Sequence, residues 1–211
     1  MSVAGAVGCS GGPLPAEAVE DMRLFLATML PDAVGEAVEQ IAADVRRQAG
    51  DIVRPVPPGS AHITHAFFGD VSDRQLDELR AAVTDVARRA VPVDVTFGPP
   101  EVLAGGRTPR LVLVPVLDGR QALFDLQVNL VLAVRRVASF ERLPLPKAPH
   151  VTVARFRRGA GQREAERVAR VLARVSPAGL GMRVDRLQLV ESLLMPDGPR
   201  YTALDEVDLS A

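Results

Sequence analysis

The sequence predicts an α+β protein with two pseudo-symmetric lobes, each an antiparallel sheet with helices on its outer side, around a central cleft. Three observations support this fold class. Short apolar runs alternate with amphipathic helical patterns, the order of these segments in residues 22–109 is repeated in residues 110–211, and a chain of 211 residues that is 47% hydrophobic can bury a sizeable core. A site formed equally by both halves should lie in the cleft between them.

The first half begins with a short apolar run that is typical of a buried strand. The next segment has an apolar residue at every third or fourth position, which predicts a helix. Ser72 and Gln75 have the spacing of a capping box and are expected to open a second helix. The expected elements are a strand over 23–29, a helix over 32–49, a proline-rich loop over 55–59, a strand over 61–68, the capped helix after Ser72 and a strand over 91–97.

The second half repeats this order just under 90 residues later. Its apolar residues follow the same two periods, every second position in strands and every third or fourth in helices. The expected elements are a strand over 110–116, a helix over 119–137, a strand over 150–156, a helix over 162–175, and strands over 183–194 and 200–207. We interpret the apolar stripes of all four helices as core.

The composition excludes several classes of protein. No apolar stretch approaches the length that spans a bilayer. A formal net charge of -1 argues against coating nucleic acid by bulk electrostatics. The single cysteine, Cys9, excludes a disulfide framework and a thiolate-rich zinc site. The chain has three histidines, so imidazole chemistry is confined to His62, His65 and His150.

Residues 1–21 differ in composition from the rest of the chain. They are rich in Gly, Ala and Pro and contain no Lys or Arg. We expect a disordered leader or a start codon assigned too early; a lipidation signal at Cys9 is opposed by the missing basic region and the short apolar segment. The cysteine-free remainder, 22–211, is expected to be one bilobal domain and a cytoplasmic protein.

The motif that carries chemistry is a duplicated His-x-Thr. His62 and Thr64 recur as His150 and Thr152 in phase with the repeat, 88 residues later. Two of three histidines meet this pattern by chance about three times in a thousand on composition alone. Because residues i and i+2 of a strand share a face, each histidine should project with its threonine. His65 falls on the other face, where a structural role is favoured.

Two imidazoles and two hydroxyls around a small volume suit acid–base chemistry at a phosphate. One histidine accepts a proton while the other donates one, and the hydroxyls bind phosphate oxygens. A metal site is the competing interpretation, but two histidines are too few ligands and neither motif adds a carboxylate on the histidine face. We expect no metal and no cofactor.

The chain resembles the 2H phosphoesterase superfamily, and within it the bacterial RNA 2′,3′-cyclic phosphodiesterases, also called 2′-5′ RNA ligases. The segments that carry the resemblance are 22–27 (MRLFLA), 62–69 (HITHAFFG), 149–155 (PHVTVAR) and 192–201 (SLLMPDGPRY). The resemblance spans residues 22–211. It implies hydrolysis of RNA or nucleotide 2′,3′-cyclic phosphates to 2′-phosphates without metal, with RNA ends or small cyclic nucleotides as substrates.

By motif position, the resemblance implies that His150 activates water and His62 protonates the departing 3′-oxygen, although the pseudo-symmetry leaves these roles exchangeable. Thr64 and Thr152 would hold the phosphate. Arg155 matches a position that the family uses near substrate, which requires the strand to end or bulge after Thr152 because simple alternation places Arg155 on the wrong face.

Two further arginines, Arg23 and Arg110, begin equivalent strands of the two halves and are weaker candidates for substrate binding. His65 stands where the family usually has an aliphatic residue, commonly Leu. The resemblance leaves two alternatives open: 2′-5′ RNA ligation by the same site, and an RNA-end-binding module in which catalysis is incidental. The chain carries no sign of an obligate protein partner, and a monomer is expected.

Overall fold

The computed structural model describes residues 21–106, 108–175, 179–195 and 198–210. The expected leader, apart from residue 21, lies outside these residues. The strands are β1 (Met22–Met29), β2 (Val53–Pro55), β3 (His62–Val71), β4 (Val93–Thr96), β5 (Glu101–Gly105), β6 (Thr108–Pro115), β7 (His150–Phe156), β8 (Gly181–Val184), β9 (Arg186–Met195) and β10 (Gly198–Asp208). The helices are α1 (Asp32–Ala49), α2 (Asp73–Ala87), α3 (Arg120–Val134), α4 (Gln162–Leu172) and the 3₁₀ turn Ala138–Phe140.

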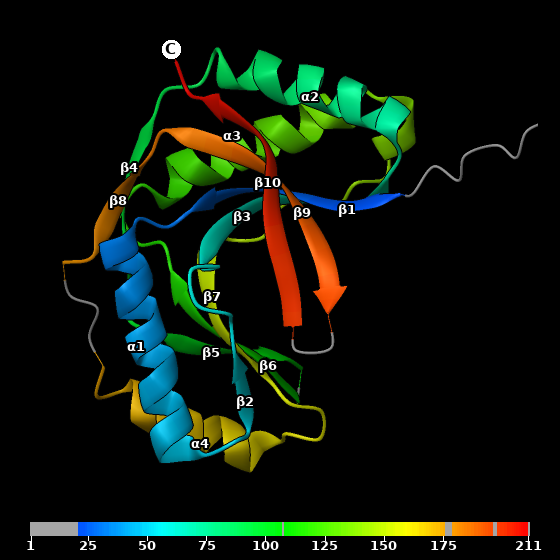
Figure 1. Cartoon of the computed structure of the whole chain (residues 1–211). Helices are drawn as coiled ribbons and strands as arrows, with labels where there is room; N and C mark the ends of the chain where they lie inside the picture. Colours follow the sequence, from blue (N-terminus) through cyan, green and yellow to red (C-terminus); the bar gives the residue numbers. More distant parts are fainter. Residues whose placement is uncertain (1–20, 107, 176–178, 196–197, 211) are drawn as a thin grey trace, which may run out of the picture.

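Eight strands form one antiparallel sheet in the order β10-β9-β1-β3-β7-β6-β5, with β2 paired to β7 beside this path (Figure 1). The strands β4 and β8 form a separate two-stranded sheet. The pairing between the two middle strands of the large sheet is short. Strand β3 pairs with β7 at one residue pair, Ile63 with Val151. This junction divides the sheet into a first lobe (β10, β9, β1, β3) and a second lobe (β7, β6, β5, β2).

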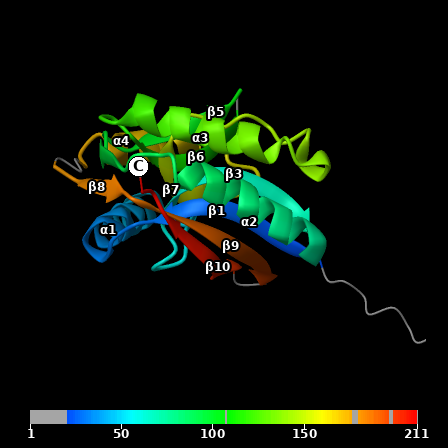
Figure 2. The ribbon, with the colours of Figure 1, turned by 90° about the horizontal axis from the view of Figure 1, so that it is seen from above.

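Each lobe takes its helices from both halves of the sequence. Helix α3, from the second half, packs with α2 and on β3 in the first lobe, where Figure 2 shows both helices on the same side of β1 and β3. Helix α1, from the first half, packs with α4 and on β2 and β7 in the second lobe. The α+β fold with two lobes is therefore confirmed, but neither lobe corresponds to one half of the sequence. Strands cross as well as helices: β9 and β10 lie in the first lobe, and β2 and β5 lie in the second.

The predicted helices and long strands are observed within a few residues of their expected bounds. The apolar stripe of α1 is buried at Val34, Val38, Ile41 and Val45, as expected for core. At the start of α2, the Ser72 N–H donates to Gln75 Oε1 at 2.8 Å, which is the backbone half of the predicted capping box.

Three expectations about strands were wrong. The expected strand 183–194 is two strands, β8 and β9, which belong to different sheets. The loop after α1 contains the short strand β2, and β5 was not expected at all. These segments are short or proline-flanked, and their pairing with distant strands decides their conformation. No helix among the described residues is long and apolar enough to cross a membrane.

Candidate active site

The junction between the lobes brings the two His-x-Thr motifs together. Ile63 and Val151, the middle residues of the motifs, are paired and fully buried. In an antiparallel pair, the residues on either side of such a pair project to the opposite face. That face carries His62, Thr64, His150 and Thr152, all of them only partly buried. The predicted grouping of these four side chains on one face is therefore what the register produces.

The two histidine rings are held by equivalent hydrogen bonds. Nδ1 of His62 lies 2.7 Å from the Ser60 carbonyl oxygen, and Nδ1 of His150 lies 2.8 Å from the Ala148 carbonyl oxygen. A carbonyl oxygen only accepts, so Nδ1 must carry a proton in both rings. In a neutral ring, Nε2 then carries a lone pair that can accept a proton. In a charged ring, Nε2 carries a proton that it can donate.

Strand β7 contains the bulge that the expected role of Arg155 requires. Its pairing with β6 passes from Thr152 to Ala154 and leaves Val153 as an extra residue. Strand β3 has the equivalent bulge, with His65 left out of its pairing with β1. A bulge shifts the alternation by one residue, so Arg155 and its counterpart Phe67 are both exposed beyond the bulges.

Aromatic rings form a wall beside His62. The Phe25 ring centroid lies 5.0 Å from that of His62, and the Tyr201 ring meets His62 edge-on at 5.4 Å. Tyr201 also packs edge-on against Phe25 at 5.1 Å, and Phe67 lies 5.7 Å from Phe25. No role for Tyr201 follows from the sequence pattern, because β9 and β10 join the first lobe from the far end of the chain. Phe67 could have been identified from the sequence, because it stands 88 residues before Arg155 and is therefore the equivalent position in the repeat.

The pKa values of His62 and Tyr201 are shifted in opposite directions. Burial lowers the pKa of His62 below its ordinary value; the hydrogen bond to Ser60 acts in the opposite direction, and the nearby charges of Arg155 and His150 lower the pKa further. Burial raises the pKa of Tyr201, with opposing effects from Arg155 and Arg23. Tyr201 is therefore a neutral hydroxyl, and Arg155 lies within electrostatic range of both rings.

Residues 30–194 match the family model described as the 2′-5′ RNA ligase superfamily. The chain belongs to this superfamily. Among curated relatives, the RNA 2′,3′-cyclic phosphodiesterase of Methanothermobacter thermautotrophicus is 29% identical over 185 residues, covering 87% of this chain and 97% of that protein. The protein of the same name from Thermus thermophilus is 30% identical over 193 residues, covering 89% and 90%.

Solved structures of similar proteins share this fold. The crystal structure of TT0787 of Thermus thermophilus has a TM-score of 0.72 and 28% identity, covering 89% of this chain and 98% of that one. Apo LigT of E. coli has a TM-score of 0.70 at 22% identity, covering 91% and 99%, and this likeness concerns the fold.

His65 differs from the other two histidines, His62 and His150, because it faces the core. It is 1% exposed, and its Nε2 lies 2.9 Å from Oγ1 of Thr28. Thr28 donates its own proton to the Arg186 carbonyl at 2.6 Å, so it must accept from His65. The amide of Gln127 donates to the Thr64 carbonyl at 3.1 Å and lies 3.5 Å from His65 Nδ1. Burial lowers the pKa of His65 to about 3, which keeps this ring neutral.

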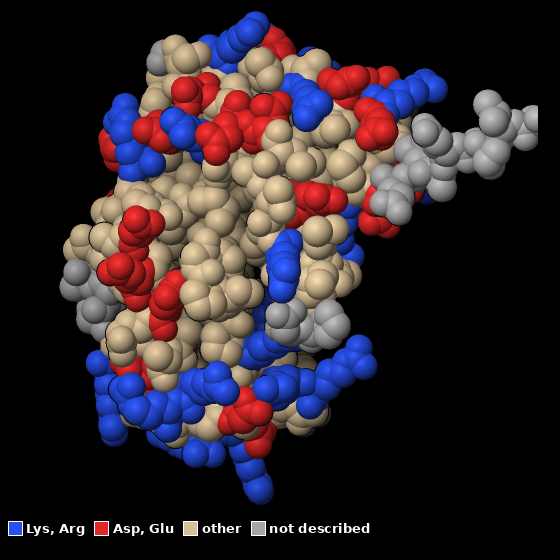
Figure 3. Space-filling view, viewed as in Figure 1, with Lys and Arg blue, Asp and Glu red and all other residues tan. Residues whose placement is uncertain are grey.

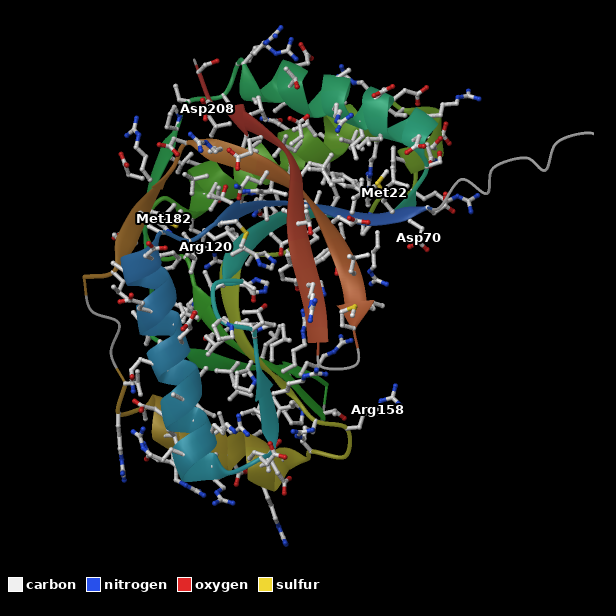
Figure 4. All side chains as sticks on the ribbon, in the orientation of Figure 1. Met22, Asp70, Arg120, Arg158, Met182 and Asp208 are labelled. Atoms are coloured by element: carbon white, nitrogen blue, oxygen red, sulfur yellow. The ribbon has the colours of Figure 1, made fainter. Side chains whose placement is uncertain are left out.

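The two weaker arginine candidates lie on strands away from the His-x-Thr motifs, although the charge of Arg23 acts on Tyr201, which packs against His62. Arg23 stands opposite Asp70 in the strand register at the outer end of β1, where Figure 4 labels Met22 and Asp70. Arg110 lies near the β5–β6 turn, against Gly105, while the opposite end of β6 is the one that pairs with His150. The described residues contain no group of three His, Cys, Asp or Glu that could hold a metal ion.

Proposed function

We propose that the chain hydrolyses 2′,3′-cyclic phosphates, at RNA ends or on small nucleotides, to 2′-phosphates without a metal ion. The observation that carries the proposal is the placement of two histidines and two threonines on one sheet face, with both rings held through Nδ1. Membership of the 2′-5′ RNA ligase superfamily and the names of the curated relatives support the substrate class.

In the proposed reaction, Nε2 of His150 takes a proton from water as the water oxygen bonds to phosphorus. The bond between phosphorus and the 3′-oxygen breaks, and His62 donates its Nε2 proton to that oxygen. The products are a 2′-phosphate and a free 3′-hydroxyl, and one proton has moved from His62 to His150 through the substrate. Proton exchange with solvent restores both rings. Histidine is suited to both tasks because its ordinary pKa lies close to neutral pH.

The low pKa of His62 in the free protein is consistent with an acid that is charged only when substrate is bound. A cyclic phosphate carries a negative charge, which raises the pKa of a neighbouring imidazole. Substrate binding would thereby favour the uptake of a proton from solvent by His62, and Thr64 and Thr152 would donate hydrogen bonds to the phosphate oxygens. Arg155 would add a positive charge on the same side.

A second candidate activity is 2′-5′ RNA ligation, which the description of the family model favours. The same two histidines could serve it, because a 5′-hydroxyl would replace water in a reaction with the same proton transfers. A module that binds RNA ends with incidental catalysis is less favoured, since both motifs are intact. We also propose that the domain acts in the cytoplasm as a monomer and without a cofactor.

The proposal is tested by phosphorus NMR of adenosine 2′,3′-cyclic phosphate incubated with the protein in excess chelator. Adenosine 2′-phosphate is the expected product. A preparation of His150→Ala, purified identically, controls for contaminating ribonuclease. A 3′-phosphate product, or turnover that needs added metal, would contradict the proposal. Adenosine, which has a 5′-hydroxyl and no phosphorus of its own, added to the same reaction would reveal ligation as a new phosphodiester resonance.

A further inference from the structure

Arg54 on β2 lies directly opposite Arg155 on β7 in an antiparallel pair. Opposite residues in such a pair share a face, with Cβ atoms about 5 Å apart. Both arginines are exposed, whereas Val53, the preceding residue of β2, is fully buried on the other face. Strand β2 is short but firmly placed, because the Val56 N–H donates to the Val153 carbonyl at 3.0 Å just beyond it.

Two like charges directly opposite one another are unfavourable in a sheet unless something neutralises them. Among the described residues, neither Arg54 nor Arg155 forms an ion pair with a carboxylate, although Arg157, the first residue after β7, pairs with Asp51 at 2.8 Å. Two unneutralised guanidinium groups on one face supply the planar, forked donors that bind a phosphate.

The arginine pair lies beside the histidines without coinciding with them. Arg155 is three residues beyond Thr152, roughly 10 Å along the strand. Its charge nevertheless acts on His62 and Tyr201. Nη2 of Arg54 lies 3.2 Å from the position that a Cβ of Gly198 would occupy, so it reaches the start of β10, three residues before Tyr201. The pair thus borders the same site from the second lobe, whose surface over α4 is rich in Lys and Arg (Figure 3).

We propose that Arg54 and Arg155 bind a second phosphate: the 5′-phosphate of the nucleotide whose 2′,3′-cyclic phosphate is at His62 and His150. This inference rests on the proposed function and names a substrate class for it. A cyclic end that carries a 5′-phosphate is preferred to a nucleoside cyclic phosphate. In RNA this phosphate is the phosphodiester to the preceding nucleotide, and in a free nucleotide it is a terminal monoester.

Calorimetric titration with two nucleotides that differ only in the 5′-phosphate tests the proposal without requiring catalysis. Adenosine 2′,5′-bisphosphate should bind the wild-type protein about tenfold more tightly than adenosine 2′-phosphate, as expected for a charge-assisted contact. In Arg54→Gln this ratio should fall to about threefold or less, and Arg54→Lys, which keeps the charge, should restore part of it.

Arg47→Gln is the matched control. Arg47 is an exposed arginine of α1 in the same lobe, paired with Asp44 at 2.5 Å, and its loss changes the net charge by the same amount. It should leave the ratio unchanged. Equal affinities of the two nucleotides for the wild type, no measurable binding of either, or an equal loss for both in Arg54→Gln would overturn the proposal, whether or not the protein hydrolyses cyclic phosphates.

The source of the second phosphate is distinguished by the rate of hydrolysis of two substrates. A dinucleotide that ends in a cyclic phosphate carries the 5′-phosphate as a phosphodiester, and adenosine 5′-phosphate 2′,3′-cyclic phosphate carries it as a monoester. A higher kcat/KM for the dinucleotide assigns the site to RNA, and a higher value for the monoester assigns it to free nucleotides. In either case the preference over adenosine 2′,3′-cyclic phosphate should be reduced in Arg54→Gln.

Discussion

Replacing His65 with Leu is expected to make the free energy of unfolding less sensitive to acid, because the buried imidazole contributes to that sensitivity. His65 is buried and neutral in the folded protein, with a pKa lowered to about 3, whereas the ordinary value of 6.5 applies to the unfolded chain. Between these two values the unfolded state binds a proton that the folded state does not. The free energy of unfolding therefore falls as the pH falls through this window.

The size of the effect follows from the same two values. One proton of difference corresponds to about 1.4 kcal/mol of stability per pH unit. The stabilisation is fully present above about pH 6.5 and is lost on the way to about pH 3. Between pH 8 and pH 5, His65 alone should cost about 2 kcal/mol of stability. The substitution leaves the Thr28 hydroxyl bonded to the Arg186 carbonyl and the Gln127 amide bonded to the Thr64 carbonyl.

The assay is urea unfolding of the wild type and His65→Leu at pH 8 and pH 5. The other histidines titrate in both proteins, so the difference between the proteins isolates His65. Relative to the wild type, the variant should gain about 2 kcal/mol on going from pH 8 to pH 5. Turnover of a cyclic phosphate should be largely retained at pH 8. Parallel pH dependences, or a loss of turnover as large as in His62→Ala, would refute the structural role of His65.

Three further predictions concern the site. Thr64→Val and Thr152→Val each remove one hydroxyl from the phosphate, so kcat/KM should fall about tenfold to a hundredfold with folding intact, as circular dichroism can verify; unchanged kinetics would exclude these hydroxyls. Arg155→Gln removes a positive charge that lowers the pKa of His62, so NMR titration of that imidazole should move to higher pH, and a downward move would contradict the placement of Arg155. Tyr201→Leu removes the ring packed on His62 and should lower kcat by more than Tyr201→Phe does; equal effects would assign the role to the hydroxyl.

The sequence predicts the helices and the central strands because their apolar periods are long and regular. It also predicts the histidine face, since the side chains of residues i and i+2 share one side of any strand. The need for a bulge before Arg155 could be stated from alternation alone, and the extra residue Val153 is where the structure meets that need.

The remaining features depend on contacts between distant segments. β2 has three residues and is held by its pairing with β7, so a local pattern dominated by prolines predicts only a loop. Tyr201 reaches His62 because β9 pairs with β1 and brings β10 with it. The opposition of Arg54 and Arg155 likewise depends on a register that no local sequence pattern contains.

The central claim is that His62 and His150 act as a pair of proton donor and acceptor on one phosphate. Its most direct test is the turnover of adenosine 2′,3′-cyclic phosphate by His62→Ala, His150→Ala and the double variant, each checked for folding. If the two rings act in one step, either single substitution should abolish nearly all activity, and the double variant should be little worse than either alone. Substantial activity in either single variant, or losses that multiply in the double variant, would contradict the claim.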